Sequence, residues 1–156
     1  MPQGSRRVAA VTLSQVKKEA AKMLGMENGY STGIMNTVEF QPEGISEGKD
    51  GVLSFPWVSR QAVLNGFKTT HGGALATLAD SFTRLHLAAA APGSLLSSVS
   101  FEISYLAPVA ENVECNCVTR LVNKDVGALV FMDYSFEDKK TGRVFARGSH
   151  VLSCSG

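Results

Sequence analysis

Hydrophobic positions recur with two different periods along the chain, and the longest helical pattern runs from Gly72 to Ala91. Ala and Leu predominate there and no Pro intervenes, which favours a helix of about twenty residues. On a helical wheel of about 100° per residue, the side opposite Asp80 is apolar and carries Leu75, Leu78, Phe82 and Leu85. The side of Asp80 carries Gly73, Thr77 and Arg84. The pattern predicts a central helix with a broad buried face and one narrow polar stripe.

A second helical pattern starts at Thr12. Gln15 follows the Thr cap by three residues, which is the spacing of a capping box. Apolar residues follow at helical spacing: Val16, Ala20, Met23 and Leu24. Gly25 is expected to end this helix. Residues 1–11 have no sustained pattern and are predicted to be a loose N-terminal tail.

Strand patterns flank the central helix. Apolar and polar residues alternate from Ile34 to Phe40, and Val52 to Val58 reads as a second strand, so the two are predicted to form a hairpin. Pro56 cannot donate to a strand ladder, which suggests an edge position or a bulge. Trp57 is expected to be a buried or half-buried sheet residue.

After the central helix the pattern becomes persistently that of strands. Four segments are rich in Val, Phe, Tyr, Ser and Thr and are separated by turn residues: Leu95–Leu106, Asn112–Asn123, Gly127–Glu137 and Val144–Leu152. The order of elements predicts an α+β fold in which one antiparallel sheet wraps a mostly apolar helix. Residues 12–156 are expected to form a single domain. The edges of such a sheet need protection, for which a second subunit is one solution.

Composition narrows the classes of function. The 156 residues are 44% hydrophobic and carry a formal charge of +1, and no basic block is long enough to follow a phosphate backbone, so a nucleic-acid partner is not expected. No apolar run approaches eighteen residues, and the N-terminus lacks the apolar core of a secretory signal. Cys115, Cys117 and Cys154 form an odd set without Cys-x-x-Cys spacing, which favours a reducing compartment. We expect a cytoplasmic or mitochondrial protein without a membrane span.

The start of the central helix is the first candidate for chemistry. His71, Gly72 and Gly73 lie where unpaired backbone N–H groups and the positive end of the helix dipole favour a negatively charged oxygen. Each feature also has a simpler interpretation. A Gly-Gly pair often marks a turn, His71 could be a structural residue, and Asp80 with Arg84 has the spacing of an exposed ion pair.

The combination of these residues resembles a known family. Asn65 precedes His71-Gly72-Gly73 by six residues, Asp80 follows His71 by nine, and the segment from Ser98 ends in Tyr-x-x-Pro at Pro108. This arrangement resembles the hot-dog-fold acyl-CoA thioesterases of the phenylacetic-acid-degradation and thioesterase-superfamily-member-two type. The resemblance covers residues 30–152. It implies a hot-dog fold with an extra N-terminal helix and a role in acyl-CoA or fatty-acid metabolism.

The resemblance also implies roles for individual residues. The Asn65 side chain and the Gly72 N–H would polarise the thioester carbonyl, and Asp80 would act as general base or nucleophile. Ser98 falls where the family has a serine that holds the water, and His71 where a histidine contacts the substrate. The expected substrate-binding residues are Gly73, Thr77, Lys68 and Arg143; Lys124, Lys139 and Lys140 are further candidates for the phosphates of coenzyme A.

No metal or separate cofactor is expected, because the three histidines lack ligand spacing and coenzyme A is part of the substrate. The family implies a homodimer or a dimer of dimers, in which Asn65 and Gly72 of one subunit face Asp80 of the other. Gly72 and Asp80 lie about 12 Å apart along one helix, which is too far for both to contact one carbon. Two other functions stay open: a non-catalytic protein that binds acyl thioesters, and an acyl-thioester dehydratase or hydratase.

Overall fold

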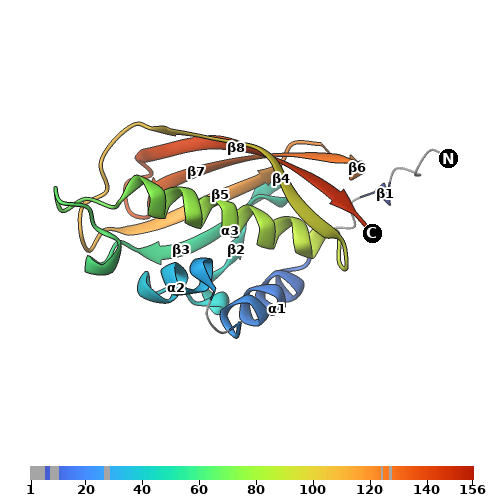
Figure 1. The fold of residues 1–156 in the computed structure, drawn as a ribbon, viewed down its shortest axis with the longest axis horizontal. Coiled ribbons are helices and arrows are strands. Elements are labelled where there is room, and N and C mark those ends of the chain that lie inside the picture. Colours follow the sequence, from blue (N-terminus) through green and yellow to red (C-terminus); the bar gives the residue numbers. More distant parts are fainter. Residues whose placement is uncertain (1–5, 8–10, 27–28, 124, 127) are drawn as a thin grey trace.

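A long helix held between a curved sheet and two shorter helices forms the framework of the protein (Figure 1). The computed structural model describes residues 6–7, 11–26, 29–123, 125–126 and 128–156. The helices are α1 (Leu13–Leu24), α2 (Tyr30–Thr37) and α3 (Gly72–Ala90). Three short 3-10 helices lie at Pro42–Gly44, Lys49–Gly51 and Gln61–Val63.

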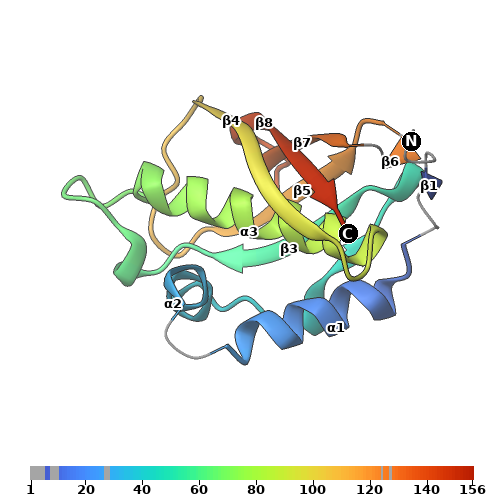
Figure 2. The same ribbon diagram turned by 45° about the vertical axis from the view of Figure 1, so that its right-hand side comes forward.

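The six-stranded sheet has the order β2-β3-β5-β7-β8-β4, and its paired strands are antiparallel. The strands are β2 (Ser46–Glu47), β3 (Leu53–Val58), β4 (Leu95–Tyr105), β5 (Glu114–Leu121), β7 (Leu129–Asp138) and β8 (Val144–Ser155). The four strands predicted after the central helix are therefore confirmed, with shifts of a few residues at their ends. Seen from the side, the sheet curves around α3 (Figure 2). β4 forms one edge of this sheet, beside the helix.

α3 buries the face that its sequence predicts. Leu78 and Phe82 have no exposed surface, and Leu75 and Leu85 are 3% and 4% exposed. The Phe82 ring stacks on Phe55 of β3 with 4.8 Å between centroids. Burial of such side chains contributes about 1.5–3 kcal/mol each. The long apolar face thus fixes the helix against the sheet and leaves the stripe of Asp80 toward solvent.

α1 also forms as its sequence predicts. The Thr12 hydroxyl accepts from the Gln15 N–H, and the Gln15 side chain accepts from the Thr12 N–H, which completes the capping box. Gly25 stands at the C-cap. Val16 and Ala20 are fully buried. This helix packs against α3 on the side away from the sheet (Figure 2).

The strand predicted for Ile34–Phe40 is wrong, because residues 30–37 form α2. Thr32, Met35 and Val38 are the buried positions, and their spacing of three residues is that of a helix rather than a strand. Packing against α3 therefore decides the conformation of this short segment over its alternating pattern. The predicted hairpin is consequently absent: β3 pairs with β2 on one side and β5 on the other.

Local expectations for β3 are confirmed, and its neighbour β5 contributes two buried cysteines. The pairing with β2 reaches only Leu53 and Ser54, so Pro56 lies where β3 has β5 as its single described neighbour. Trp57 is 2% exposed and packs edge-on against Phe136 at 5.8 Å. Cys115 and Cys117 are both fully buried.

The predicted N-terminal tail, residues 1–11, falls mostly outside the described residues. Within it, Arg6–Arg7 form β1, which pairs antiparallel with β6 (Asp125–Val126). This two-stranded ladder lies at the end of the molecule that carries the C-terminus, beside the six-stranded sheet (Figure 1). The domain boundary at residue 12 stays a prediction.

Candidate functional site

Four polar side chains meet where the middle of α3 faces β4 and β8. Arg84 Nε donates to Asp80 Oδ1 at 3.0 Å, and Arg84 Nη2 donates to Ser98 Oγ at 2.5 Å. Ser98 Oγ also lies 2.7 Å from Nε2 of His150 and 3.5 Å from Asp80 Oδ1. The Asp80 side chain is 36% exposed, whereas His150 is fully buried. A carboxylate open to solvent is thus backed by a hydroxyl and a buried imidazole.

An irregularity in β4 brings Ser98 into this cluster. The pairing of β4 with β8 shifts between Ser98 and Ser100, so Val99 is an extra residue in β4. In a regular strand Ser98 and Phe101 would point to opposite faces, because side chains alternate. With the bulge, Ser98 reaches α3 while Phe101 stacks on the buried Tyr134 at 5.6 Å. The bulge therefore sets which serine of the Ser97–Ser100 segment joins Asp80.

The hydrogen-bond partners of His150 define its tautomer. The Thr83 hydroxyl lies 2.7 Å from the Ala79 carbonyl oxygen, to which it donates, and 2.7 Å from Nδ1 of His150. Because that hydroxyl has one hydrogen, it accepts from Nδ1–H, and Nε2 is left as an acceptor. Ser98 then donates its hydrogen to Nε2. This assignment leaves one lone pair of Ser98 Oγ open to a further donor.

Burial lowers the pKa of His150, and the positive charge of Arg84 lowers it further, against the opposing effect of Asp80. The imidazole is therefore neutral at neutral pH, in agreement with its role as acceptor from Ser98. The neighbouring carboxylate and guanidinium carry opposite charges and balance each other. The cluster as a whole thus combines one anion, one cation and two neutral groups.

A second polar cluster lies at the start of α3. Asn65 Oδ1 accepts from the N–H groups of Phe67 and Thr69 at 2.9 and 3.2 Å, and Asn65 Nδ2 donates to Thr69 Oγ1 at 3.0 Å. These contacts close the loop and fix the plane of the amide. One hydrogen of Nδ2 has no partner among the described residues, so the side chain retains a donor.

His71 caps α3 with its side chain, since Nδ1 accepts from the Gly73 N–H at 2.9 Å. The Gly72 N–H has no acceptor within the described parts of the chain. Tyr105 of β4 donates its hydroxyl to the Gly72 carbonyl oxygen at 2.8 Å. A Cβ on Gly72 would lie 3.1 Å from the Tyr105 ring, which explains a glycine at this close approach. Tyr105 therefore anchors a helix start whose first N–H is available.

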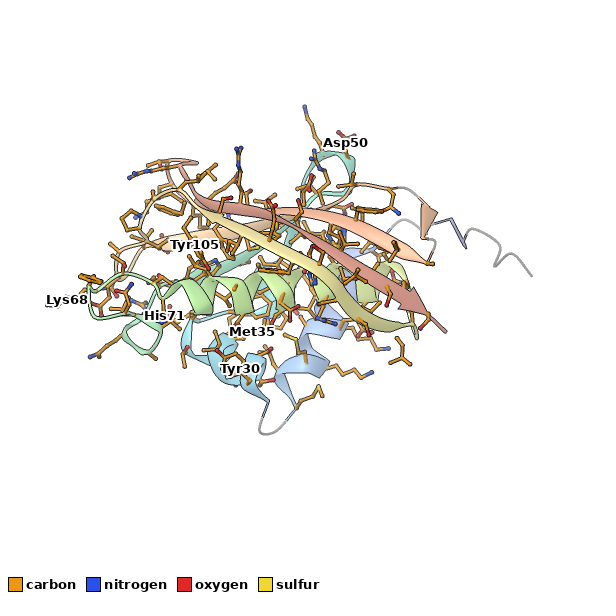
Figure 3. All side chains as sticks on the ribbon, turned by 45° about the horizontal axis from the view of Figure 1, so that its top comes forward. Tyr30, Met35, Asp50, Lys68, His71 and Tyr105 are labelled. Carbon is orange, nitrogen blue, oxygen red and sulfur yellow. The ribbon has the colours of Figure 1, made fainter. Side chains whose placement is uncertain are left out.

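The expected substrate-binding residues divide between the two clusters. Thr77 lies one turn before Asp80, with its hydroxyl donated to the Gly73 carbonyl oxygen at 2.8 Å. Lys68 is exposed on the loop before α3, and Figure 3 places it with His71 and Tyr105 at one end of the molecule. Arg143 follows the turn between β7 and β8, with its guanidinium 5.9 Å from the Phe145 ring centroid. The Phe145 carbonyl accepts from Leu106 N–H, which brings this turn to the same end.

A pocket of about 310 Å³ adjoins Asp80 between α2, α3 and β4. Its lining consists of Tyr30, Ser31, Ala76, Thr77, Asp80 and Phe101. Tyr30 is 73% exposed and forms an outer wall. Its walls thus combine apolar and aromatic groups with the hydroxyls of Ser31 and Thr77 and one carboxylate. One side comes from α2, the helix that the sequence did not predict.

The structure brings Asp80 and Ser98 together, and separately groups Asn65, His71, Gly72 and Gly73. It does not bring the two groups together within one chain, because they sit at different turns of α3. Sequence reasoning missed His150, which entered it only as one of three histidines without the spacing of metal ligands. A usable signal exists: His150 falls between Gly148 and Leu152 on the inward-facing positions of β8, where an isolated polar residue needs a buried partner.

The described residues also bear on metal binding and on membrane crossing. They contain no cluster of three or more His, Cys, Asp or Glu side chains placed to hold a metal ion. None of their helices combines the length and the apolarity that crossing a membrane requires.

Similarity to known proteins supports the fold and the family resemblance. No protein-family model matches the chain. Human acyl-coenzyme A thioesterase 13 is 34% identical over 87 residues, which are 56% of this chain and 61% of that protein. The chain thus matches about three fifths of the length of this curated relative. The similarity confirms the resemblance to hot-dog thioesterases that Asn65, His71-Gly72-Gly73 and Asp80 indicate.

Solved structures extend the similarity over nearly the whole chain. Zebrafish thioesterase superfamily member 2 superposes with a TM-score of 0.76 at 21% identity, covering 93% of this chain and 99% of that one. The PaaI protein of the Escherichia coli phenylacetic acid degradation operon gives 0.73 at 16% identity, covering 95% and 97%. A Streptococcus pneumoniae thioesterase with coenzyme A gives 0.63 at 20% identity, covering 72% and 87%. The chain has the hot-dog fold, as its sequence predicts.

Proposed function

We propose that this protein hydrolyses acyl-CoA thioesters, with Asp80 as the general base. The observation that carries the proposal is the contact of Asp80, Ser98 and His150 at an open pocket, since it supplies a carboxylate and a second acceptor for one water. The similarity to acyl-coenzyme A thioesterase 13 supports the reaction class, and the neighbour with coenzyme A supports the ligand class.

The two acceptors suggest how water is held. Asp80 Oδ1 accepts from Arg84, so Oδ2 is the oxygen available to a water hydrogen. The open lone pair of Ser98 Oγ accepts the other hydrogen, because its own hydrogen goes to His150. Both water hydrogens then point to the protein and a lone pair of the water oxygen points outward. This is the orientation that attack on a carbonyl carbon requires.

In the reaction, the water oxygen forms a bond to the thioester carbon as one of its hydrogens passes to Asp80. The carbonyl oxygen becomes an oxyanion, which would accept from the Gly72 N–H and from Asn65 Nδ2 at a helix N-terminus. Collapse of the intermediate breaks the carbon–sulfur bond, and the proton on Asp80 passes to the departing thiolate. The products are the free acid and coenzyme A, and Asp80 is again a carboxylate.

The donors and Asp80 would come from different subunits of a homodimer. Gly72 and Asp80 are eight residues apart on α3, about 12 Å along its axis, so one chain does not direct both at one carbon. β4 is an edge strand that pairs with β8 on one side and has no partner strand among the described residues on the other, and it exposes Leu95, Val99 and Tyr105. A second copy at this edge would bring two antiparallel α3 helices side by side. A dimer of dimers is a further possible assembly of this unit.

The substrate would lie across both clusters. The acyl group fits the apolar pocket beside Asp80, whose walls include Tyr30 and Phe101. Lys68 and Arg143, at the end of the molecule that carries Gly72, are candidates to meet the phosphates of coenzyme A. Gly73 and Thr77 would line the path between the two.

Release of free thiol from short, medium, long and aromatic acyl-CoAs tests this function. We expect turnover of at least one class, with kcat lowered about 10²-fold or more in Asp80→Asn protein that retains the wild-type melting temperature. Binding of acyl-CoA without turnover would replace the hydrolase by a non-catalytic binding protein. Addition or loss of water across the carbon–carbon bond of an enoyl-CoA or 3-hydroxyacyl-CoA would identify a hydratase or dehydratase instead.

A further inference from the structure

The Arg84 guanidinium joins three groups on two elements. Besides Asp80 Oδ1 and Ser98 Oγ, it donates through Nη1 to the Leu96 carbonyl oxygen at 3.1 Å. Its side chain is 33% exposed, so it bridges α3 and β4 at the rim of the site rather than in the core. The planar guanidinium presents its donors in a fixed fork, which a Lys ammonium cannot reproduce.

An ordinary helical ion pair would be the simpler explanation, since Asp80 and Arg84 are four residues apart and such pairs contribute about 0.3–0.5 kcal/mol. That explanation covers only the first contact. The two others cross to β4, and one of them ends on the serine that faces Asp80. A useful comparison is Arg120 on the outer face of the sheet, which contacts the single carboxylate of Asp133 at 3.1 Å.

The direction of each hydrogen bond gives Arg84 its effect on the site. A guanidinium only donates and does not lose its proton in proteins, so both Asp80 Oδ1 and Ser98 Oγ must accept from it. Ser98 is then left to donate its one hydrogen, and Nε2 of His150 is nearer than Asp80 Oδ1, at 2.7 against 3.5 Å. Asp80 Oδ2, by contrast, has no partner in the described part of the chain.

We propose that Arg84 is the positioning residue of this site: it selects Oδ2 as the reactive oxygen of Asp80 and turns the Ser98 hydroxyl toward His150. The inference rests on the proposed hydrolysis for its kinetic consequence, but not for its hydrogen-bond geometry. Without Arg84 the carboxylate can rotate, and Ser98 can donate to Asp80 instead of His150. The water would then lose both of its fixed acceptors while the substrate pocket keeps its walls.

Kinetics of Arg84→Ala, Arg84→Lys and the control Arg120→Ala test the proposal on an acyl-CoA that the wild type hydrolyses. We expect Arg84→Ala to lower kcat about 10² -fold, as misplacement of reacting groups by about 1 Å does, with KM changed little. Arg84→Lys keeps the charge but not the fork and should recover only part of the loss. Arg120→Ala should retain the wild-type kcat, because its ion pair is remote from Asp80.

Chemical rescue separates positioning from stability. Guanidinium ion at concentrations below the unfolding transition should restore part of the Arg84→Ala activity, with no such gain for wild type or with urea. A wild-type kcat in folded Arg84→Ala, or a loss that follows the melting temperature and does not respond to guanidinium, would overturn the proposal.

A measurement independent of turnover uses the ¹⁵N chemical shifts of the His150 ring. In wild type we expect protonated Nδ1 and an unprotonated, hydrogen-bonded Nε2; in Arg84→Ala the Nε2 signal should move toward that of an imidazole without a donor. Unchanged shifts would refute the effect of Arg84 on Ser98. If the wild type hydrolyses no acyl-CoA, the proposed function is wrong. The chemical shifts then still show whether Arg84 turns the Ser98 hydroxyl toward His150.

Discussion

The two polar clusters on α3 are built in opposite ways. At the helix start, Asn65, His71 and Gly72 lie within eight residues of sequence, and most of their contacts are to the loop itself. In the middle of the helix, Asp80 meets Ser98 from β4 and His150 from β8, which are 18 and 70 residues further along. One cluster is a local loop and cap, and the other exists only when three elements pack.

The clusters also differ in the chemistry that they offer. The helix start retains hydrogen-bond donors, the Gly72 N–H and one hydrogen of Asn65 Nδ2. The middle retains acceptors, Asp80 Oδ2 and a lone pair of Ser98. Hydrolysis of a thioester needs donors for the oxyanion and acceptors for the water, so neither cluster suffices alone. Variants of each cluster should therefore lose activity separately, and a mixed dimer should show whether the two clusters act together.

The largest effect is expected for the middle cluster. Asp80→Asn should lower kcat about 10²–10⁴-fold, the range for removal of a positioned base. The new amide oxygen can still accept from Arg84, so thermal unfolding should stay close to wild type. Steady-state kinetics and melting curves check this. A collapse of stability with a normal rate per folded molecule would make Asp80 structural instead.

At the helix start, two variants separate the loop from the donor. Asn65→Ala removes both the acceptor that holds Phe67 and Thr69 N–H and the donor, whereas Asn65→Asp keeps the acceptor and loses the donor. Both should lose about 2.7–4 kcal/mol of transition-state stabilisation, the cost of one oxyanion donor. The measurement is kcat/KM for both variants. Full activity in Asn65→Asp would assign the residue to the loop alone.

A buried histidine in the second half of α3 should make the fold sensitive to acid. His86 is 1% exposed, contacts Thr119 Oγ1 at 2.8 Å, and has its pKa lowered by burial to about 4. The unfolded chain, with a His pKa of about 6.5, binds more protons between these values. The contribution of His86 to stability is therefore fully present above about pH 6.5 and is lost, by about 3 kcal/mol, as the pH drops through 4. His150, whose pKa burial also lowers, adds a loss in the same direction.

Denaturant unfolding between neutral pH and pH 4 measures this loss. In His86→Gln, an amide replaces the titrating ring and can still contact Thr119, so the pH dependence should become flatter. A pH dependence in His86→Gln as steep as that of the wild type would place the acid-sensitive group elsewhere, for example at His150.

The smallest expected effect is the activity recovered when a variant of one cluster is mixed with a variant of the other. Co-refolding equal amounts of Asn65→Ala and Asp80→Asn should make about half the dimers mixed, each with one intact site and one doubly defective site. About a quarter of wild-type activity should return, measured as thiol release. No recovery in a sample proven to contain mixed dimers would place both clusters of one site in the same subunit, and a monomer by light scattering would exclude a shared site altogether.

Elements with a long, single-period pattern could be predicted from the sequence. The structure has the apolar face of α3 and the four later strands as predicted, because each pattern repeats over several turns or pleats. It also has the predicted capping box of α1, which depends only on two residues three positions apart. Residues 34–40 could not be assigned in this way. Their pattern covers one short stretch that fits two periods, and contact with α3 selects the helix.

The cluster at the start of α3 could be predicted from the sequence for a related reason. A helix cap and a tight loop are formed by residues close together in sequence, so the spacing of Asn65, His71 and Gly72 already brings these residues together. For the middle cluster, the family resemblance named Asp80 and Ser98, but the prediction lacked His150 and the contacts of Arg84 with β4. The bulge at Val99 selects Ser98, the pairing of β8 with β4 delivers His150, and the fork of Arg84 depends on where β4 passes α3. Contacts between residues far apart in sequence arise from packing and strand register, which no local pattern encodes.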